Sequence, residues 1–75
     1  MTNADRAKTA RKACETFAPL VGLDMDDEEA VAAQDLVTNL MHMCHADGGD
    51  AYQMVAAAGR RFQEEYEEEE FGGDE

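Results

Sequence analysis

Residues 35–66 read DLVTNLMHMCHADGGDAYQMVAAAGRRFQEEY, and this stretch decides the fold. Apolar residues recur every three or four positions on both sides of a glycine pair, which is the spacing of one face of an α-helix. The stripe residues are Ala33, Leu36, Val37, Leu40, Met43 and Cys44 before the pair, and Ala51, Val55, Ala58, Phe62 and Tyr66 after it. The pattern therefore predicts two amphipathic helices.

The connection between these helices combines a helix end with a helix start. Gly48 can adopt the left-handed conformation that commonly ends a helix. Asp50 can cap the next helix, and Gln53 stands three residues further on, as a capping box requires. Because so short a connection makes two helices antiparallel neighbours, we expect a helical hairpin at about residues 27–46 and 50–67.

An N-terminal helix is predicted before the hairpin. Thr2 and Asp5 have capping-box spacing. Apolar residues again follow at intervals of three and four, namely Ala7, Ala10, Cys14 and Phe17. Pro19 disfavours helical geometry at the residue before it, and Gly22 is a stop signal, so this helix is expected at about residues 3–18.

The segment between the first two helices is unusually apolar for a loop. We expect Leu20, Val21 and Leu23 to lie under the hairpin, away from solvent. Asp26 is expected to cap the next helix, because Glu29 stands three residues on and acidic residues in a first turn favour the positive end of the helix dipole.

The chain is short for a stable domain. Its 75 residues can hide only about 60% of the unfolded surface. We expect residues 1–70 to form a single all-α domain of three helices and residues 71–75 to be a disordered acidic tail. Since self-association is a common remedy for a small core, a homodimeric bundle is expected. Cys14 and Cys44 are expected to be free thiols in a reducing cytosol.

The charge of the chain narrows the choice of partners. Eighteen acidic residues stand against six basic ones, giving a formal net charge of −12. Such a chain repels nucleic acid and anionic membranes, so we expect neither as a direct partner and expect a protein with a basic surface instead. No signal peptide and no apolar run of about 20 residues is present, so a soluble, cytoplasmic protein is predicted.

One small cluster has the residue types of a reactive site. His42, Cys44 and His45 stand within four positions, and the two histidines could share a helix face. Their spacing differs from the HExxH arrangement of helical zinc sites, and Cys44 points away from both imidazoles. We therefore predict no catalytic residue, no metal ligand and no cofactor, and do not expect an enzyme. A metal-dependent protein using His42, His45 and a carboxylate is the least favoured alternative.

The acidic residues are concentrated near two helix ends, which we take as candidate partner-binding surfaces. The larger group is Glu64, Glu65, Glu67, Glu68, Glu69 and Glu70, and the smaller group is Asp26, Asp27, Glu28 and Glu29. On an α-helix the larger group carries one charge per 1.75 Å or so, close to the roughly 1.7 Å of duplex DNA. The alternative interpretation is a tail that only keeps the protein in solution.

The hairpin also resembles a group of known sequences. The residues that carry the resemblance are Leu36, Val37, Leu40 and His42, then Asp47, Gly48, Asp50 and Tyr52, then Ala57, Ala58, Arg61, Phe62 and Glu65. This layout is similar to small uncharacterised acidic helical open reading frames of bacteria, phages and plasmids. That setting includes anti-CRISPR and anti-restriction inhibitors, some of which are DNA mimics in charge. The resemblance implies a bacterial or phage-infected host cell and assigns no activity residue by residue.

Two functional hypotheses follow. The first is a small acidic inhibitor, anti-CRISPR-like, that blocks a basic nucleic-acid-binding or nuclease surface of a host defence protein. The alternative is a dimeric structural or regulatory adaptor that binds its partner through the apolar face of the hairpin. The two differ in salt dependence, because binding through exposed charges weakens as salt screens them.

Overall fold

The computed structural model describes the backbone of residues 1–72 and the side-chain surroundings of residues 1–70. It contains the α-helices α1 (Asn3–Leu20), α2 (Met25–Ala46) and α3 (Ala51–Glu67), followed by the π-helical turn η1 (Glu68–Gly72). The described part contains no strand, so the predicted all-α class with three helices is confirmed. No helix in that part is long and apolar enough to cross a membrane. The rest of the predicted tail, residues 73–75, lies outside the described residues.

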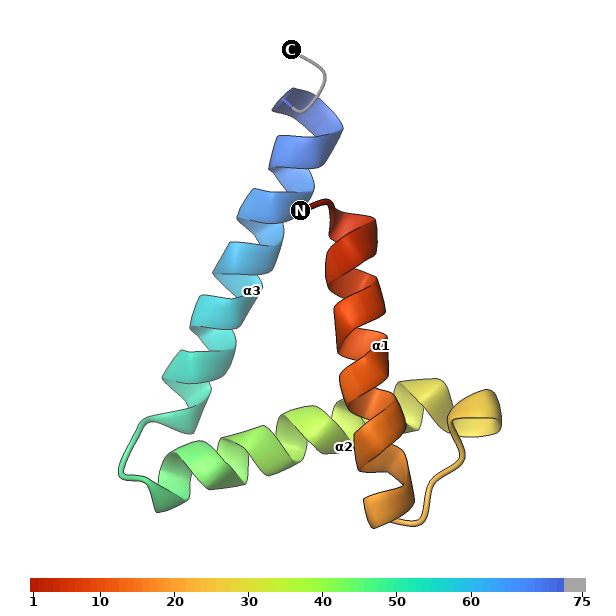
Figure 1. The fold of residues 1–75 in the computed structure, drawn as a ribbon. Coiled ribbons are helices and arrows are strands. Elements are labelled where there is room, and N and C mark those ends of the chain that lie inside the picture. Colours follow the sequence, from red (N-terminus) through yellow and green to blue (C-terminus); the bar gives the residue numbers. More distant parts are fainter. Residues whose placement is uncertain (73–75) are drawn as a thin grey trace.

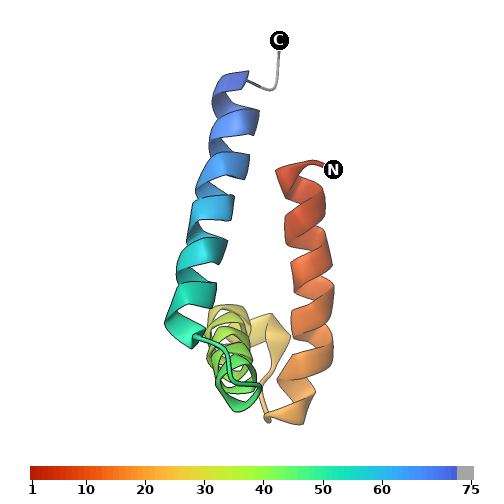
Figure 2. The same ribbon diagram turned by 90° about the vertical axis from the view of Figure 1, so that its left-hand side faces the viewer.

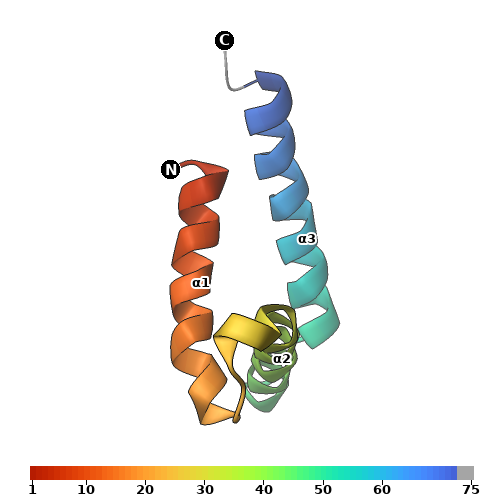
Figure 3. The ribbon, with the colours of Figure 1, turned by 90° about the vertical axis from the view of Figure 1, so that its right-hand side faces the viewer.

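The three helices form an open triangle (Figure 1). α1 descends along one side, α2 crosses the base, and α3 rises along the other side. When the molecule is turned, α2 is seen end-on, α3 rises from it, and the lower half of α1 lies beside it (Figures 2 and 3). The two arms of the hairpin therefore diverge after their turn, and the far end of α3 approaches the start of α1. The principal extents of the molecule are 44 × 33 × 16 Å, so it is flat.

The start of α1 follows the prediction. The Thr2 hydroxyl accepts a hydrogen bond from the Asp5 backbone N–H at 3.1 Å, and the Asp5 carboxylate accepts one from the Thr2 N–H at 3.1 Å. The reciprocal pair satisfies two of the backbone donors that an α-helix leaves free at its first turn. Local chemistry alone thus fixes this helix end.

The end of α1 lies two residues beyond the predicted position. Pro19 is inside the helix, which ends at Leu20. A proline near a helix end removes only one backbone hydrogen bond, and its fixed φ is compatible with helical geometry. Gly22, at φ +77°, then closes the helix, because the Leu23 N–H donates to the Ala18 carbonyl and the Gly22 N–H donates to the Pro19 carbonyl. The stop at Gly22 is confirmed, and the stop before Pro19 is wrong.

The start of α2 also differs from the prediction. The N-cap is Asp24, whose carboxylate accepts from the Asp26 N–H at 2.9 Å, so the assignment of the cap to Asp26 is wrong. The Asp24 N–H in turn donates to the Glu28 carboxylate. Glu28 has non-helical angles (φ −130°, ψ 35°), which separate a first turn from the main body of α2. Two aspartates with similar capping chemistry made the choice between them ambiguous in the sequence.

The turn between α2 and α3 is as predicted. Gly48 has φ +86°, and the Gly49 N–H donates to the Cys44 carbonyl at 2.9 Å. Asp50 caps α3 by accepting from the Gln53 N–H at 3.0 Å. A Cβ atom at Gly49 would lie 2.7 Å from the Cys44 sulfur and 3.2 Å from the Cys44 carbonyl oxygen, so a larger residue there would force Cys44 to shift.

The core of the single chain is very small. Among residues 1–70 only Cys14, Ala18 and Ala32 are buried, where α1 crosses α2. Both cysteines are free thiols, Cys14 buried and Cys44 half-buried. The expectation that Leu20 and Val21 lie under the hairpin is wrong, because their exposed fractions are 79% and 40%. Leu20 is the last residue of α1 and Val21 follows it, at the corner of the triangle where the chain passes from α1 to α2 (Figure 1).

Candidate functional site

The larger group of acidic residues lies where α3 passes into η1. Glu64, Glu67, Glu68 and Glu70 are exposed, and no ion pair involves any of them in the part of the chain that the structure describes. Only the Glu67 carboxylate has a side-chain partner, the amide of Gln63 at 2.9 Å. These four carboxylates are therefore free to face a partner.

Two members of the same group have a different role, because they hold α1. Glu65 is half-buried and pairs with Arg6 at 3.3 Å, while Arg61 lies 4.0 Å away. The Asn3 side-chain amide donates to the Glu65 carbonyl at 3.1 Å, and the Asn3 backbone N–H donates to the Glu69 carboxylate. The predicted site thus divides into two groups. The outward set, Glu64, Glu67, Glu68 and Glu70, is exposed, whereas Glu65 and Glu69 contact α1 and close the triangle. Sequence reasoning missed this division, because Asn3 and Glu65 are 62 residues apart.

The smaller group surrounds the first turn of α2. Asp26 and Asp27 are exposed, Glu28 is half-buried against the cap, and Glu29 accepts from Arg11 at 3.2 Å. The Arg11 pair is more than half exposed on both sides, so it is expected to contribute at most about 1 kcal/mol. Figure 1 places this turn and the end of α3 at different corners of the triangle. The two predicted surfaces are therefore separate.

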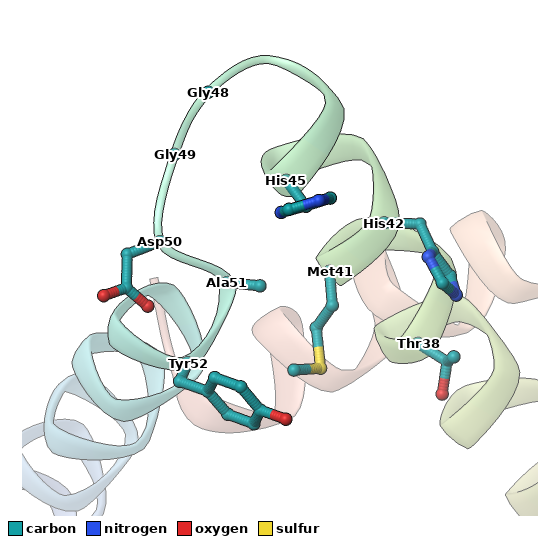
Figure 4. A pocket seen from close by; sticks show the side chains of 9 residues that line it. All are labelled: Thr38, Met41, His42, His45, Gly48, Gly49, Asp50, Ala51 and Tyr52. Atoms are coloured by element: carbon teal, nitrogen blue, oxygen red, sulfur yellow. The ribbon is translucent and has the colours of Figure 1, made fainter.

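A shallow pocket of about 610 Å³ lies beside the turn between α2 and α3 (Figure 4). Its lining residues are Thr38, Met41, His42, His45, Gly48, Gly49, Asp50, Ala51 and Tyr52. Figure 4 shows both imidazoles on the α2 side, with Met41 between them and Tyr52, while the Asp50 carboxylate lies on the outer side of the turn. Asp50 is already used as a helix cap.

This pocket has an apolar floor and few groups that could perform chemistry. In residues 1–70 the structure groups no three His, Cys, Asp or Glu side chains in a manner that could hold a metal ion. Cys44 faces Gly49, so it does not join His42 and His45. Sequence reasoning missed the association of Tyr52 with Met41 and the histidines, although the two-glycine turn that causes it was recognised.

The apolar stripes are the other prominent surface feature. No residue of α3 is buried, and Phe62 and Tyr66 stack on each other with ring centroids 6.1 Å apart. On α2, Val37, Leu40 and Met43 are exposed as well. Large apolar side chains that are exposed along one helix face are candidates for an interaction surface.

No protein-family model, no curated protein and no solved structure matches the chain. The surfaces described above are therefore the basis on which a function can be proposed.

Proposed function

We propose that this chain is a small acidic protein-binding inhibitor that blocks a basic nucleic-acid-binding or nuclease surface of a host defence protein. It acts as anti-CRISPR-like proteins do, in the cytoplasm of a bacterial or phage-infected cell. The observation that carries the proposal is the outward set of glutamates on α3 and η1, Glu64, Glu67, Glu68 and Glu70. All four are exposed, and none of them forms an ion pair within residues 1–70.

The physical basis is local charge density. The outward set places four carboxylates within the seven residues 64–70, and at the α-helical rise of 1.5 Å or so per residue this is about one charge per 2.6 Å, compared with roughly 1.7 Å along duplex DNA. A groove that binds phosphates presents lysine and arginine side chains, which attract such carboxylates. Docking acidic side chains there brings opposite charges together and excludes the nucleic acid that the groove would otherwise hold.

The fold supports this role by fixing the direction of the carboxylates. Glu65 and Glu69 contact α1 through Arg6 and Asn3, and these contacts anchor the last turns of the helical rod. The remaining carboxylates project from the anchored segment. An anchored surface loses less conformational freedom on binding than a free tail does.

The test compares two variants of equal net charge. Glu64→Lys/Glu68→Lys reverses two charges in the outward set, and Glu15→Lys/Asp35→Lys reverses two exposed charges elsewhere, so both change the net charge from −12 to −8. Each protein is added to purified CRISPR and restriction nucleases, and the readout is cleavage of duplex DNA at 50 and 300 mM salt.

We expect inhibition of at least one nuclease at low salt, weakened at high salt because exposed charges are screened. The Glu64/Glu68 variant should inhibit at least about tenfold less well, which corresponds to 1.4 kcal/mol or so for two reversed contacts. The Glu15/Asp35 variant should inhibit like the native protein. If both variants lost the same amount of inhibition, the effect would depend on net charge alone and not on the outward set. If the native protein inhibited no nuclease in the panel, the proposed activity would be contradicted.

A second candidate function is supported by the exposed apolar residues of the hairpin. In this version the chain is a dimeric regulatory adaptor that binds its partner through Val37, Leu40 and neighbouring positions, whose side chains are 46% and 39% exposed. Apolar association depends little on salt. Changing Leu40→Glu would then abolish partner binding, whereas the Glu64→Lys/Glu68→Lys variant would bind normally.

A further inference from the structure

The exposed face of α3 is strongly apolar and has no neighbour within the chain. Val55, Phe62 and Tyr66 of the predicted stripe remain 37%, 65% and 45% exposed. The half-buried positions are Ala51, at the start of the stripe, and Met54 and Glu65, which lie to one side of it. The side of α3 that contacts the rest of the chain is therefore not its most apolar side. A surface helix normally buries its apolar stripe.

Gly59 borders this stripe, between Val55 and Phe62 along the helix, and no contact within the described residues explains it. A Cβ atom at Gly59 would meet no atom within 4 Å, and the residue has no positive φ. Glycine inside a helix is less favourable than alanine. Because glycine has no side chain, it would let another backbone approach α3 closely at this point.

The dimensions of the chain provide an independent argument. Its accessible surface is 6010 Å², whereas a compact monomer of 8.2 kDa has about 4,500 Å². Its radius of gyration is 14.4 Å, compared with about 11 Å for a compact chain of this length. The excess surface of about 1,500 Å² exceeds the roughly 800 Å² that each partner buries in a standard interface.

We propose that the uncovered face of α3 packs against a second copy of this chain, α3 against α3, along Val55, Gly59, Phe62 and Tyr66. A closed twofold interface of this kind uses the same stripe on both copies.

The charges determine the relative direction of the two α3 helices. A parallel arrangement would place the Glu64–Glu70 runs of both copies side by side, with six carboxylates in each. Like charges at that separation repel, whereas an antiparallel arrangement puts the runs at opposite ends of the dimer. A twofold axis between Ala58 and Gly59 then sets Phe62 against the second copy's Val55. The four outward glutamates stay accessible, so the dimer does not depend on the inhibitory function proposed above.

The first test is the mass of the native chain in solution. Sedimentation equilibrium or light scattering at 10–100 µM, roughly the range in which a standard interface is populated, should give twice the 8.2 kDa of the chain. A single-chain mass across this range, or a mass other than twice that of the chain, overturns the proposal. A chain whose apolar face is covered by a different protein would also have the mass of a single chain when it is pure. A single-chain mass therefore contradicts the dimer in that case too.

Matched substitutions locate the interface. Gly59→Leu and Ala57→Leu place the same side chain at two exposed positions of α3, of which only the first borders the stripe. Gly59→Leu should raise the dimer dissociation constant at least tenfold, and Ala57→Leu should leave it unchanged. Equal effects of the two changes would contradict the proposed face.

Because Gly59→Leu could also unfold a chain that depends on its second copy, a cross-link provides a separate readout. Gly59→Cys lies next to the proposed axis and should form an intermolecular disulfide under mild oxidation, since paired Cα atoms must lie within about 7 Å. Ala57→Cys, on the other side of α3, should remain reduced, and the native protein with Cys14 and Cys44 gives the background. Oxidation of Ala57→Cys as fast as Gly59→Cys would overturn the close crossing at Gly59.

Discussion

The Arg6 Nε atom lies 3.3 Å from a carboxylate oxygen of Glu65, and this ion pair joins the start of α1 to the end of α3. Together with the hydrogen bonds from Asn3 it closes the third corner of the triangle. The other two corners are covalent connections through short loops. The third corner therefore depends on polar contacts, because none of the buried residues in 1–70 lies between α1 and α3 there.

Removing this ion pair should loosen α3 while leaving the crossing of α1 and α2 in place. We expect Arg6→Ala to lower the free energy of unfolding by up to about 1 kcal/mol, because both side chains are partly exposed. Amide hydrogen exchange should increase in the last turns of α3 first. Arg60→Ala is the control, since Arg60 is exposed and forms no ion pair within the described residues. A double-mutant cycle with Glu65→Gln should give a coupling energy close to zero if the contact is absent in solution.

The corrected cap of α2 leads to a second prediction. Asp24→Ala removes the carboxylate that accepts from the Asp26 N–H, and it should lower the free energy of unfolding by about 0.5–2 kcal/mol. Asp26→Ala removes the same charge from the same turn without removing a cap, so its effect should be clearly smaller. Chemical denaturation of both variants measures the difference. A larger loss of stability in Asp26→Ala than in Asp24→Ala would mean that Asp26 is the cap.

The small core at the crossing of α1 and α2 gives a third prediction. Ala32 is completely buried, and its neighbour Ala33 is exposed. Ala32→Leu should lower the free energy of unfolding by about 1–3 kcal/mol, because the larger side chain forces the helices apart. Ala33→Leu adds the same side chain on the outside and is the matched control. Thermal unfolding followed by circular dichroism should show a lower stability for Ala32→Leu than for Ala33→Leu. Equal stability of the two variants would mean that the helices do not pack closely at Ala32.

Asp5 gives a prediction about pH. The Thr2 backbone N–H and then the Thr2 hydroxyl hydrogen-bond the Asp5 carboxylate, which lowers the pKa of Asp5 below its usual 3.8. A carboxyl whose folded-state pKa is lowered adds stability above the unfolded pKa and loses it as the pH falls through the folded value. Asp5→Asn should therefore be less stable than the native protein at pH 7 and should approach it below pH 3.8.

Urea denaturation of both proteins between pH 2.5 and pH 7, a range that spans the titration of aspartate carboxyls, measures this convergence. Asp35→Asn is the control, because it removes one exposed carboxylate from the middle of α2 without removing a cap. A difference between Asp5→Asn and the native protein that stays constant over this range would mean that the capping box does not form.

The sequence predicted those parts of the fold that depend on neighbouring residues. The Thr2 and Asp50 caps and the left-handed Gly48 follow from contacts within three residues, and all are present. The choice between Asp24 and Asp26 was wrong, because both residues can cap and the kink at Glu28 decides between them. Helical periodicity also showed which residues share a face, but not which face the chain covers.

The candidate site was predictable to a similar degree. The run of glutamates is visible in the sequence, and the predicted helix boundaries already placed it at the end of α3. The division of that run is a long-range property, since Glu65 and Glu69 are engaged by residues from the opposite end of the sequence. Exposed Phe62 was equally unexpected, because its spacing is that of a core residue.

The contact between Asn3 and Glu69 also makes the backbone nearly a ring. A short flexible linker replacing the last residues could join Thr2 to the end of η1 covalently, and new termini could be opened at the exposed Asp47–Asp50 turn. Such a circular permutant would keep α1 attached to α3 even where the Arg6–Glu65 pair is broken. Because the link between α1 and α3 would then be covalent, that corner of the triangle should depend less on salt than the native ion pair does.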